Sequence, residues 1–185
     1  MSIRKTIEVV AKLAERGAIQ RYAIAGAVAA INYIEPTSTE DVDILVSIAD
    51  FEHRQSGLIL LTPIEKALAE MGYTERTDVG FRIEGWPVQF LPVASDLDEE
   101  ALERAIEVEF DLTGDPPLKA RCLRAEHLVA IAVKLGRLKD LARVQAFLEQ
   151  KAVDLTALKD VLVRHRLMDN WLSFCAKAGI ENPLK

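Results

Sequence analysis

Cysteine is scarce in this 185-residue sequence, which contains only Cys122 and Cys175. The two are far apart and have no partner at metal-ligand spacing, so we expect neither a disulfide framework nor a zinc site. The sequence also lacks an apolar run of about 18 residues, the length that a membrane helix requires. Its first residues carry charges instead of the apolar run of a signal peptide. We therefore expect a cytoplasmic protein without a membrane partner.

An excess of positive charge is absent too. The chain has 23 Lys and Arg against 29 Asp and Glu, a formal net charge of −6, so any phosphate site must be local. No glycine-rich dinucleotide motif, P-loop or Gly-x-Ser-x-Gly elbow occurs, which disfavours those three kinds of site. The three histidines have no acid or cysteine at ligand spacing and are interpreted as surface or core residues. The composition, 50% hydrophobic and 28% charged, is that of an ordinary globular protein.

The hydrophobic pattern predicts an α/β (α+β) fold in which a helical part follows a small mixed sheet. We place a domain boundary at Pro116, which gives an α/β core at 1–115 and a helical domain at 116–185. Strands are predicted at 19–25, 41–47, 73–77, 81–86 and 87–93, the last two joined near Gly85. Helices are predicted at 3–17, 27–33, 63–71 with Thr62 as N-cap, 97–109, 125–135, 138–150 and 155–165, and around Trp171 and Phe174.

Two acids share one face of a predicted strand. Asp41 and Asp43 are two residues apart, so their carboxylates lie side by side and repel each other unless a cation lies between them. Magnesium takes oxygen ligands and is commonly held by one or two carboxylates together with substrate phosphates. The alternative is an ordinary solvated strand end. The pair alone does not decide between these interpretations.

Upstream, Gly26 and Ala27 lie where a predicted strand meets a helix. Free backbone N–H groups at such a join can accept a phosphate, and glycine lets the backbone approach closely. The alternative is a glycine that serves a tight turn only. The order of strand, Gly and small residue, helix, loop, and strand with Asp-x-Asp resembles the DNA polymerase beta-like nucleotidyltransferase superfamily.

Within that superfamily the sequence is similar to a bacterial toxin branch related to abortive-infection systems. The loop before Asp41 keeps the branch's Thr as Thr39 but has Thr37 where Arg is usual. Residues 87–92 resemble the strand that presents a third carboxylate. The segment 134–143 matches Lys-x-x-Arg-x-Lys-Asp-x-x-Asp through Lys134, Arg137, Lys139 and Asp140, and departs from it at Arg143.

The resemblance implies a nucleotidyltransferase core in which Asp41 and Asp43 bind magnesium, with manganese as an alternative. It implies that Gly26, Ala27 and Thr39 belong to the nucleotide site. The reaction would move a nucleoside monophosphate from an NTP to a hydroxyl of an RNA such as tRNA, or of a protein. An antitoxin protein would be the partner.

Gln89 stands where active members carry the third carboxylate. An amide is a weak ligand and no general base near pH 7, so its presence favours an alternative in which the chain is a degenerate module that binds nucleotide or a partner protein. Glu84 is the candidate substitute. A third hypothesis is a structural interaction protein.

The cations of the segment 134–143 have alternatives as well. They could form the solvated face of a helix pair, although a cationic helix opposite Asp-x-Asp would compensate phosphate charge. Lys134 and Lys139 are the expected phosphate contacts, with Arg137 beside them. Asp140 either orients Lys139 or caps the helix that begins near Leu138.

Overall fold

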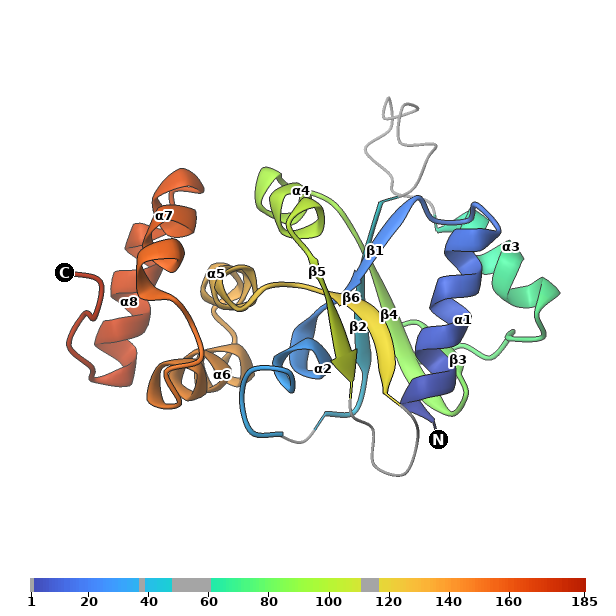
Figure 1. The fold of residues 1–185 in the computed structure, drawn as a ribbon, viewed down its shortest axis with the longest axis horizontal. Coiled ribbons are helices and arrows are strands. Elements are labelled where there is room, and N and C mark those ends of the chain that lie inside the picture. Colours follow the sequence, from blue (N-terminus) through green and yellow to red (C-terminus); the bar gives the residue numbers. More distant parts are fainter. Residues whose placement is uncertain (1, 37–38, 48–60, 111–116) are drawn as a thin grey trace.

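The computed structural model describes residues 2–36, 39–47, 61–110 and 117–185. Their strands form one six-stranded mixed sheet in the order β3-β4-β2-β1-β6-β5 (Figure 1). The expected mixed α/β fold is therefore confirmed. The strands are β1 (Arg21–Ile24), β2 (Val42–Ser47), β3 (Phe81–Ile83), β4 (Trp86–Pro92), β5 (Ile106–Phe110) and β6 (Leu118–Cys122).

The strand β2 lies inside the sheet between β1 and β4. It runs antiparallel to β1 and parallel to β4, and this register places Asp43 directly beside Gln89 and Leu45 beside Leu91. A two-residue turn joins β3 to β4, with positive φ at both Glu84 (52°) and Gly85 (86°), as the twist of a tight hairpin requires. The hairpin near Gly85 is thus confirmed.

Helices cover both faces of the sheet (Figure 1). The helices α1 and α3 lie on one face, α2 and α4 lie on the other, and α5 to α8 stack beyond α2 and α4, so the two chain ends are at opposite ends of the molecule. The bounds are α1 (Ile3–Glu15), α2 (Gly26–Ala30), α3 (Thr62–Glu70), α4 (Asp96–Glu103), α5 (Ala125–Leu135), α6 (Leu138–Glu149), α7 (Leu155–Arg164) and α8 (Met168–Ala178). None of the described helices is long and apolar enough to cross a membrane.

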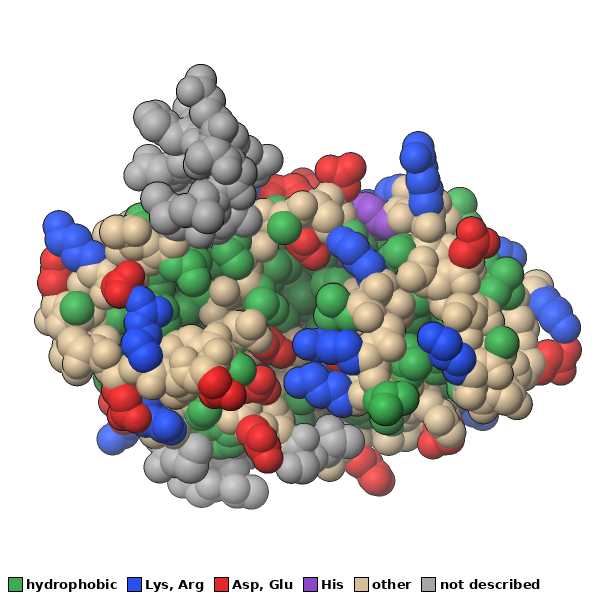
Figure 2. All heavy atoms as spheres, turned by 180° about the vertical axis from the view of Figure 1, so that it is seen from behind, with side chains coloured by type: hydrophobic (Ala, Val, Ile, Leu, Met, Phe, Trp, Pro, Cys, Tyr) green, Lys and Arg blue, Asp and Glu red, His purple; other side chains and the backbone are tan. Residues whose placement is uncertain are grey.

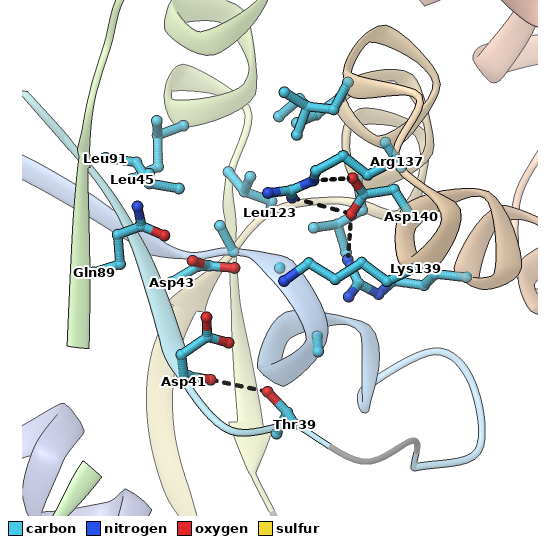
Figure 3. Close-up of a pocket in the computed structure, with 18 of the residues that line it drawn as sticks. Thr39, Asp41, Asp43, Leu45, Gln89, Leu91, Leu123, Arg137, Lys139 and Asp140 are labelled. Carbon is cyan, nitrogen blue, oxygen red and sulfur yellow. Dashed lines mark hydrogen bonds and ion pairs between the residues drawn. The ribbon is translucent and has the colours of Figure 1, made fainter. Parts of the chain in front are cut away.

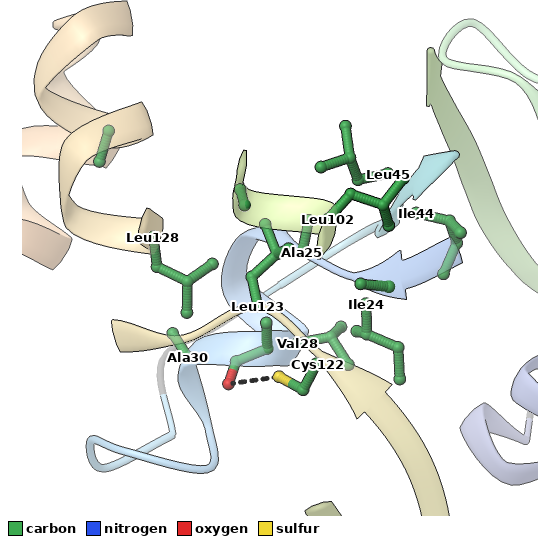
Figure 4. Packing of buried hydrophobic residues seen from close by; sticks show 14 of the residues in the cluster. Ile24, Ala25, Val28, Ala30, Ile44, Leu45, Leu102, Cys122, Leu123 and Leu128 are labelled. Carbon is green, nitrogen blue, oxygen red and sulfur yellow. Dashed lines mark hydrogen bonds between the residues drawn. The ribbon is translucent and has the colours of Figure 1, made fainter. Parts of the chain in front are cut away.

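The core beside the site is made by small and branched side chains from β1, β2, β6 and α2 (Figure 4). Ile24, Ile44 and Cys122 are fully buried there. The thiol of Cys122 donates to the carbonyl of Ala29, 3.7 Å away, which ties α2 to β6. The short helix α2 is therefore held against the sheet by its neighbours, because five residues are too few for a stable isolated helix.

Two strands differ from the sequence prediction. The pattern at 97–109 predicted one acidic helix, but α4 ends at Glu103 and the rest forms the edge strand β5. It pairs with β6, where Lys119 lies 3.8 Å from both Glu107 and Glu109. Only helices were expected after 116, yet β6 belongs to the sheet. The boundary itself lies outside the described residues, and the division into 1–115 and 116–185 stays a proposal.

Other local predictions met mixed outcomes. The segment 73–77 is not a strand, because only a single bridge joins Arg76 to Phe81. Thr62 is the first helical residue of α3, and Leu61 is the N-cap. By contrast, the helices expected at 125–135 and 155–165 are present: Gly136 ends α5 in the left-handed conformation, and the Asp154 carboxylate caps α7. Trp171 is fully buried in α8, with its ring 5.4 Å from that of Phe174.

Candidate functional site

The cavity face of β2 carries both acids. Asp43 lies in β2, and Asp41 immediately precedes the strand on the same side, while Val42 between them is fully buried on the other face. The Thr39 hydroxyl donates to the Asp41 carbonyl at 2.9 Å and fixes the loop that enters the strand. Figure 3 shows both carboxylates directed toward the same space, with Gln89 beside Asp43. The structure therefore brings Thr39, both acids and Gln89 together.

That space is a cavity of about 670 Å³, within the size range of small-molecule sites. Figure 2 shows a hollow with hydrophobic side chains in its floor and Lys and Arg side chains beside it. Residues from the sheet and its loops and residues from α5 and α6 line the cavity. Among them are all ten site residues named from the sequence: Gly26, Ala27, Thr39, Asp41, Asp43, Gln89, Lys134, Arg137, Lys139 and Asp140.

Gly26 presses the backbone of α2 against Asp43. Its φ is +59°, and a Cβ built on it would lie 2.0 Å from Oδ2 of Asp43. No other residue type fits there without displacing that carboxylate. The backbone N–H of Ala25 donates to the Asp43 carbonyl at 2.9 Å, which fixes the two segments together. Ala27 follows as a buried residue of α2 that lines the cavity.

Cations from α6 and the turn before it form the opposite wall (Figure 3). Asp140 is only 1% exposed and accepts two hydrogen bonds from the Arg137 guanidinium, at 2.5 and 3.2 Å. Oδ1, which accepts the longer of these two bonds, also lies 3.6 Å from a guanidinium nitrogen of Arg143. Of the two alternatives for Asp140, the capping role is wrong, since Arg137 is the N-cap of α6 and no side chain caps that helix. Instead Asp140 holds two arginines at the cavity, with Lys139 beside them.

The two walls act on each other electrostatically. Burial and the neighbouring Asp41 charge raise the pKa of Asp43, while Lys139, Arg143 and Arg137 work in the opposite direction. The hydrogen bond to Asp140 raises the pKa of Arg137, and Asp43 and Asp41 add to that rise. Thus the acids repel each other and attract the cations across the cavity. A cation bound beside the acids and an anion bound beside the cations would reduce the repulsion within each wall.

Two further residues named from the sequence, Lys134 and Glu84, lie away from this charged centre. The Lys134 ammonium donates to the Ser95 hydroxyl at 2.8 Å, so it reaches the N-terminus of α4. Glu84 lies in the β3–β4 turn, where its carboxylate accepts from the Tyr73 hydroxyl at 2.6 Å. Glu84 does not line the cavity and is no substitute for a carboxylate at Gln89.

Two histidines expected to be inert contact one acid outside the cavity. His165 Nε2 lies 2.7 Å and His127 Nε2 lies 3.4 Å from the carboxylate oxygens of Glu100, which also pairs with Arg164. Burial opposes ionisation of Glu100, yet the hydrogen bonds from Arg164, His165 and His127 outweigh it and lower its pKa to about 2. This cluster fastens α4 to α5 and α7. His53 lies outside the described residues.

Sequence reasoning missed residues that spacing could have found. Arg143 lies four residues after Lys139, one turn along the same helix face, and it also lines the cavity. Leu45 and Leu91 follow Asp43 and Gln89 at the two-residue period of a strand and line the cavity as well.

The oxygen donors fit magnesium bound with a phosphate substrate. Asp41 and Asp43 supply two carboxylates on one face, and the Gln89 amide oxygen is the adjacent donor. Within the part of the chain that the structure describes, no three His, Cys, Asp or Glu side chains gather into a metal site.

Comparisons with known proteins give matches in structure only. No family model and no curated protein matches the sequence. The chain is similar to the antibiotic-resistance factor ANT(2'')-Ia in solution, with 14% identity, a TM-score of 0.47 and coverage of 94% of this chain and 97% of that one. It is similar to the crystal structure of ANT(2")-Ia with adenylyl-2"-tobramycin, with 15% identity, a TM-score of 0.47 and coverage of 87% and 97%.

A third similar structure is an antigenic nucleotidyltransferase-like protein from Paracoccidioides brasiliensis. Its identity is 15% and its TM-score is 0.49, over 96% of this chain and 93% of that one. These neighbours are nucleotidyltransferases or nucleotidyltransferase-like proteins. At such identities and TM-scores the chemistry of this chain rests on its own residues.

Proposed function

We propose that this chain is a nucleotidyltransferase that binds a nucleoside triphosphate with magnesium, or manganese, and transfers its nucleoside monophosphate to a hydroxyl. The observation that carries the proposal is one cavity with Asp41 and Asp43 on one wall and Lys139, Arg137 and Arg143 on the other. A site made of carboxylates alone would repel a triphosphate. A site made of cations alone would not account for the two adjacent acids. The two walls together suit a metal-bound triphosphate.

Each residue has a role that follows from its position. Asp41 and Asp43 would hold magnesium, which when bound supplies positive charge to the phosphate oxygens. Gly26 keeps the backbone close to Asp43. The cations Arg137, Lys139 and Arg143, which we call the α6 wall, would neutralise phosphate charge. Asp140 forms its ion pairs with the two arginines and not with Lys139, and it holds the arginines in place. Thr39 would serve the same site from its rim, whereas Lys134 would have to leave the Ser95 hydroxyl to reach the phosphates.

The finer assignments stay within this proposal. By resemblance, the acceptor is an RNA or a protein, and the chain is a bacterial toxin that an antitoxin partner restrains. The two cysteines are both free and buried, which agrees with the reducing cytoplasm that we propose as its location. We also propose the superfamily assignment on the basis of the Gly26 and Asp-x-Asp arrangement.

One observation favours a second candidate, a module that binds nucleotide without turnover. Gln89 occupies the place beside Asp43, and its neutral amide neither supplies a third negative ligand nor accepts the proton of a hydroxyl. Binding would survive this substitution because both carboxylates and the cation wall remain.

Calorimetry with ATP, CTP, GTP and UTP, each with and without magnesium, tests the proposal. We expect at least one of them to bind in a magnesium-dependent manner, and Asp43→Asn to remove that dependence. The matched control is Asp160→Asn, which neutralises an exposed carboxylate on α7. Equal isotherms with and without magnesium would refute the site. Release of pyrophosphate separates the enzyme from the binding module.

A further inference from the structure

The sheet wall of the cavity changes from polar to apolar along the strands. Leu45 follows Asp43 on β2, Leu91 follows Gln89 on β4, and the two leucines are partners in the register. Two residues advance a strand by about 7 Å and return the side chain to the same face. Figure 3 shows Leu45 and Leu91 beyond Gln89, on the side away from Asp41. A ligand that extends from Asp43 along the strands therefore meets hydrocarbon.

The helix α5 supplies an apolar wall to the same cavity. Its lining side chains recur at i, i+3, i+4 and i+7, which is one helical stripe, and they are Leu128, Ile131, Ala132 and Leu135. Leu123 lies between this helix and the sheet. Leu128 and Leu123 are buried, but Leu135 remains 52% exposed at the rim. This apolar stripe of α5 therefore faces the open cavity and is not covered by another helix there.

The charged groups at this end are already engaged with each other. Lys134 donates to the Ser95 hydroxyl, and Asp98 accepts from that hydroxyl at 2.8 Å and from the Ala94 N–H at 3.2 Å. Figure 3 shows Lys139 facing the acids, while Arg137 extends toward Leu123 and is paired with Asp140. A polyanion or a polycation would gain little at the apolar end, whereas an apolar body would remove leucine surface from water.

We infer that the apolar end is the acceptor subsite, and that it takes a hydroxyl carried on an aliphatic or aromatic body. This inference rests on the proposed function, which places the phosphates between the α6 wall and the acids and so leaves the leucine end free. In the transfer, the acceptor oxygen bonds to the α-phosphorus and the bond from that phosphorus to the bridging oxygen breaks. Pyrophosphate leaves, and the hydroxyl proton passes to water.

A series of straight-chain alcohols from 1-propanol to 1-heptanol tests the subsite by ligand-observed NMR. Binding is measured on the whole protein with magnesium and the non-hydrolysable α,β-methylene ATP. We expect affinity to rise about fourfold for each methylene, as full burial of a CH₂ predicts, and glycerol and ribose to bind far more weakly. Leu135→Gln and Ile131→Gln should flatten the series. Leu138→Gln is the matched control, because Leu138 is 88% exposed and does not line the cavity.

The outcomes separate this inference from the proposed function. A flat series while the nucleotide still binds would overturn the subsite and leave the proposed function standing. Competition between alcohol and nucleotide would overturn it too, since the apolar end would then hold the base. Failure of magnesium-dependent nucleotide binding would remove the proposed function and with it the acceptor role. With ATP, pyrophosphate release should rise along the series, and faster release with an RNA 3′ hydroxyl would count against the subsite.

Discussion

Replacing Gly26 with alanine should damage stability and the site together. The new Cβ would lie 2.0 Å from Oδ2 and 2.9 Å from Cγ of Asp43, far inside contact distance. Left-handed backbone costs a residue with a Cβ about 1 to 2 kcal/mol. Displacing the carboxylate from its rotamer adds about 1 kcal/mol. We therefore expect Gly26→Ala to lose about 2 to 3 kcal/mol of unfolding free energy and to lose magnesium-dependent nucleotide binding.

Gly17→Ala is the matched control for this variant. Gly17 has a similar φ of +73°, but a Cβ there would meet nothing within 4 Å. Chemical denaturation should show only the backbone cost, about 1 to 2 kcal/mol, and calorimetry should show unchanged nucleotide binding. Combining Gly26→Ala with Asp43→Ala should cost less than the sum of the two single changes, because the displaced carboxylate is gone. Equal losses for Gly26→Ala and Gly17→Ala would refute the close approach.

Three further predictions concern charge. Glu100→Gln should lower the free energy of unfolding by up to about 3 kcal/mol at pH 7. Because folding lowers the pKa of Glu100 from 4.5 to about 2, the wild type should be the more stable protein above pH 4.5. Acid unfolding curves should show this difference vanish as the pH falls toward 2. Asp140→Asn should lower the free energy of unfolding by about 2 kcal/mol in chemical denaturation and weaken nucleotide binding, because Arg137 loses its partner; unchanged binding would contradict the role of Asp140. Gln89→Asp should lower the melting temperature without magnesium, recover it with magnesium and increase pyrophosphate release, and a magnesium-independent melting temperature would exclude a ligand role.

Local signals allowed much of the fold to be predicted from the sequence. The left-handed Gly136 and the capping Asp154 act within a turn of their own helices, so their effects are visible in a short window. The strand β5 is different. Its alternating Glu107 and Glu109 resemble an acidic helix until Lys119 of β6 pairs with them, and that contact joins residues ten or more positions apart.

The candidate site shows the same division. The two-residue spacing places Asp41 and Asp43 on one face without any knowledge of the fold. That Gln89 is the neighbour of Asp43 followed only from the resemblance, since it depends on parallel pairing of β2 and β4. Arg143 was noticed only as a departure from a motif. Its spacing from Lys139 puts the two side chains on one face of α6, but that this face meets the cavity depends on how α6 packs.

The connection between β6 and α5 is short and is fixed to the sheet by hydrogen bonds. Leu123, directly after β6, donates its N–H to Ile24 at 3.0 Å and accepts from the Tyr33 hydroxyl at 3.0 Å, and α5 begins two residues later. One side of the hollow is therefore anchored to the strand that precedes Gly26. We expect ligands to enter past Leu135 into a preformed cavity. Ligand binding should therefore change amide hydrogen exchange along α5 very little.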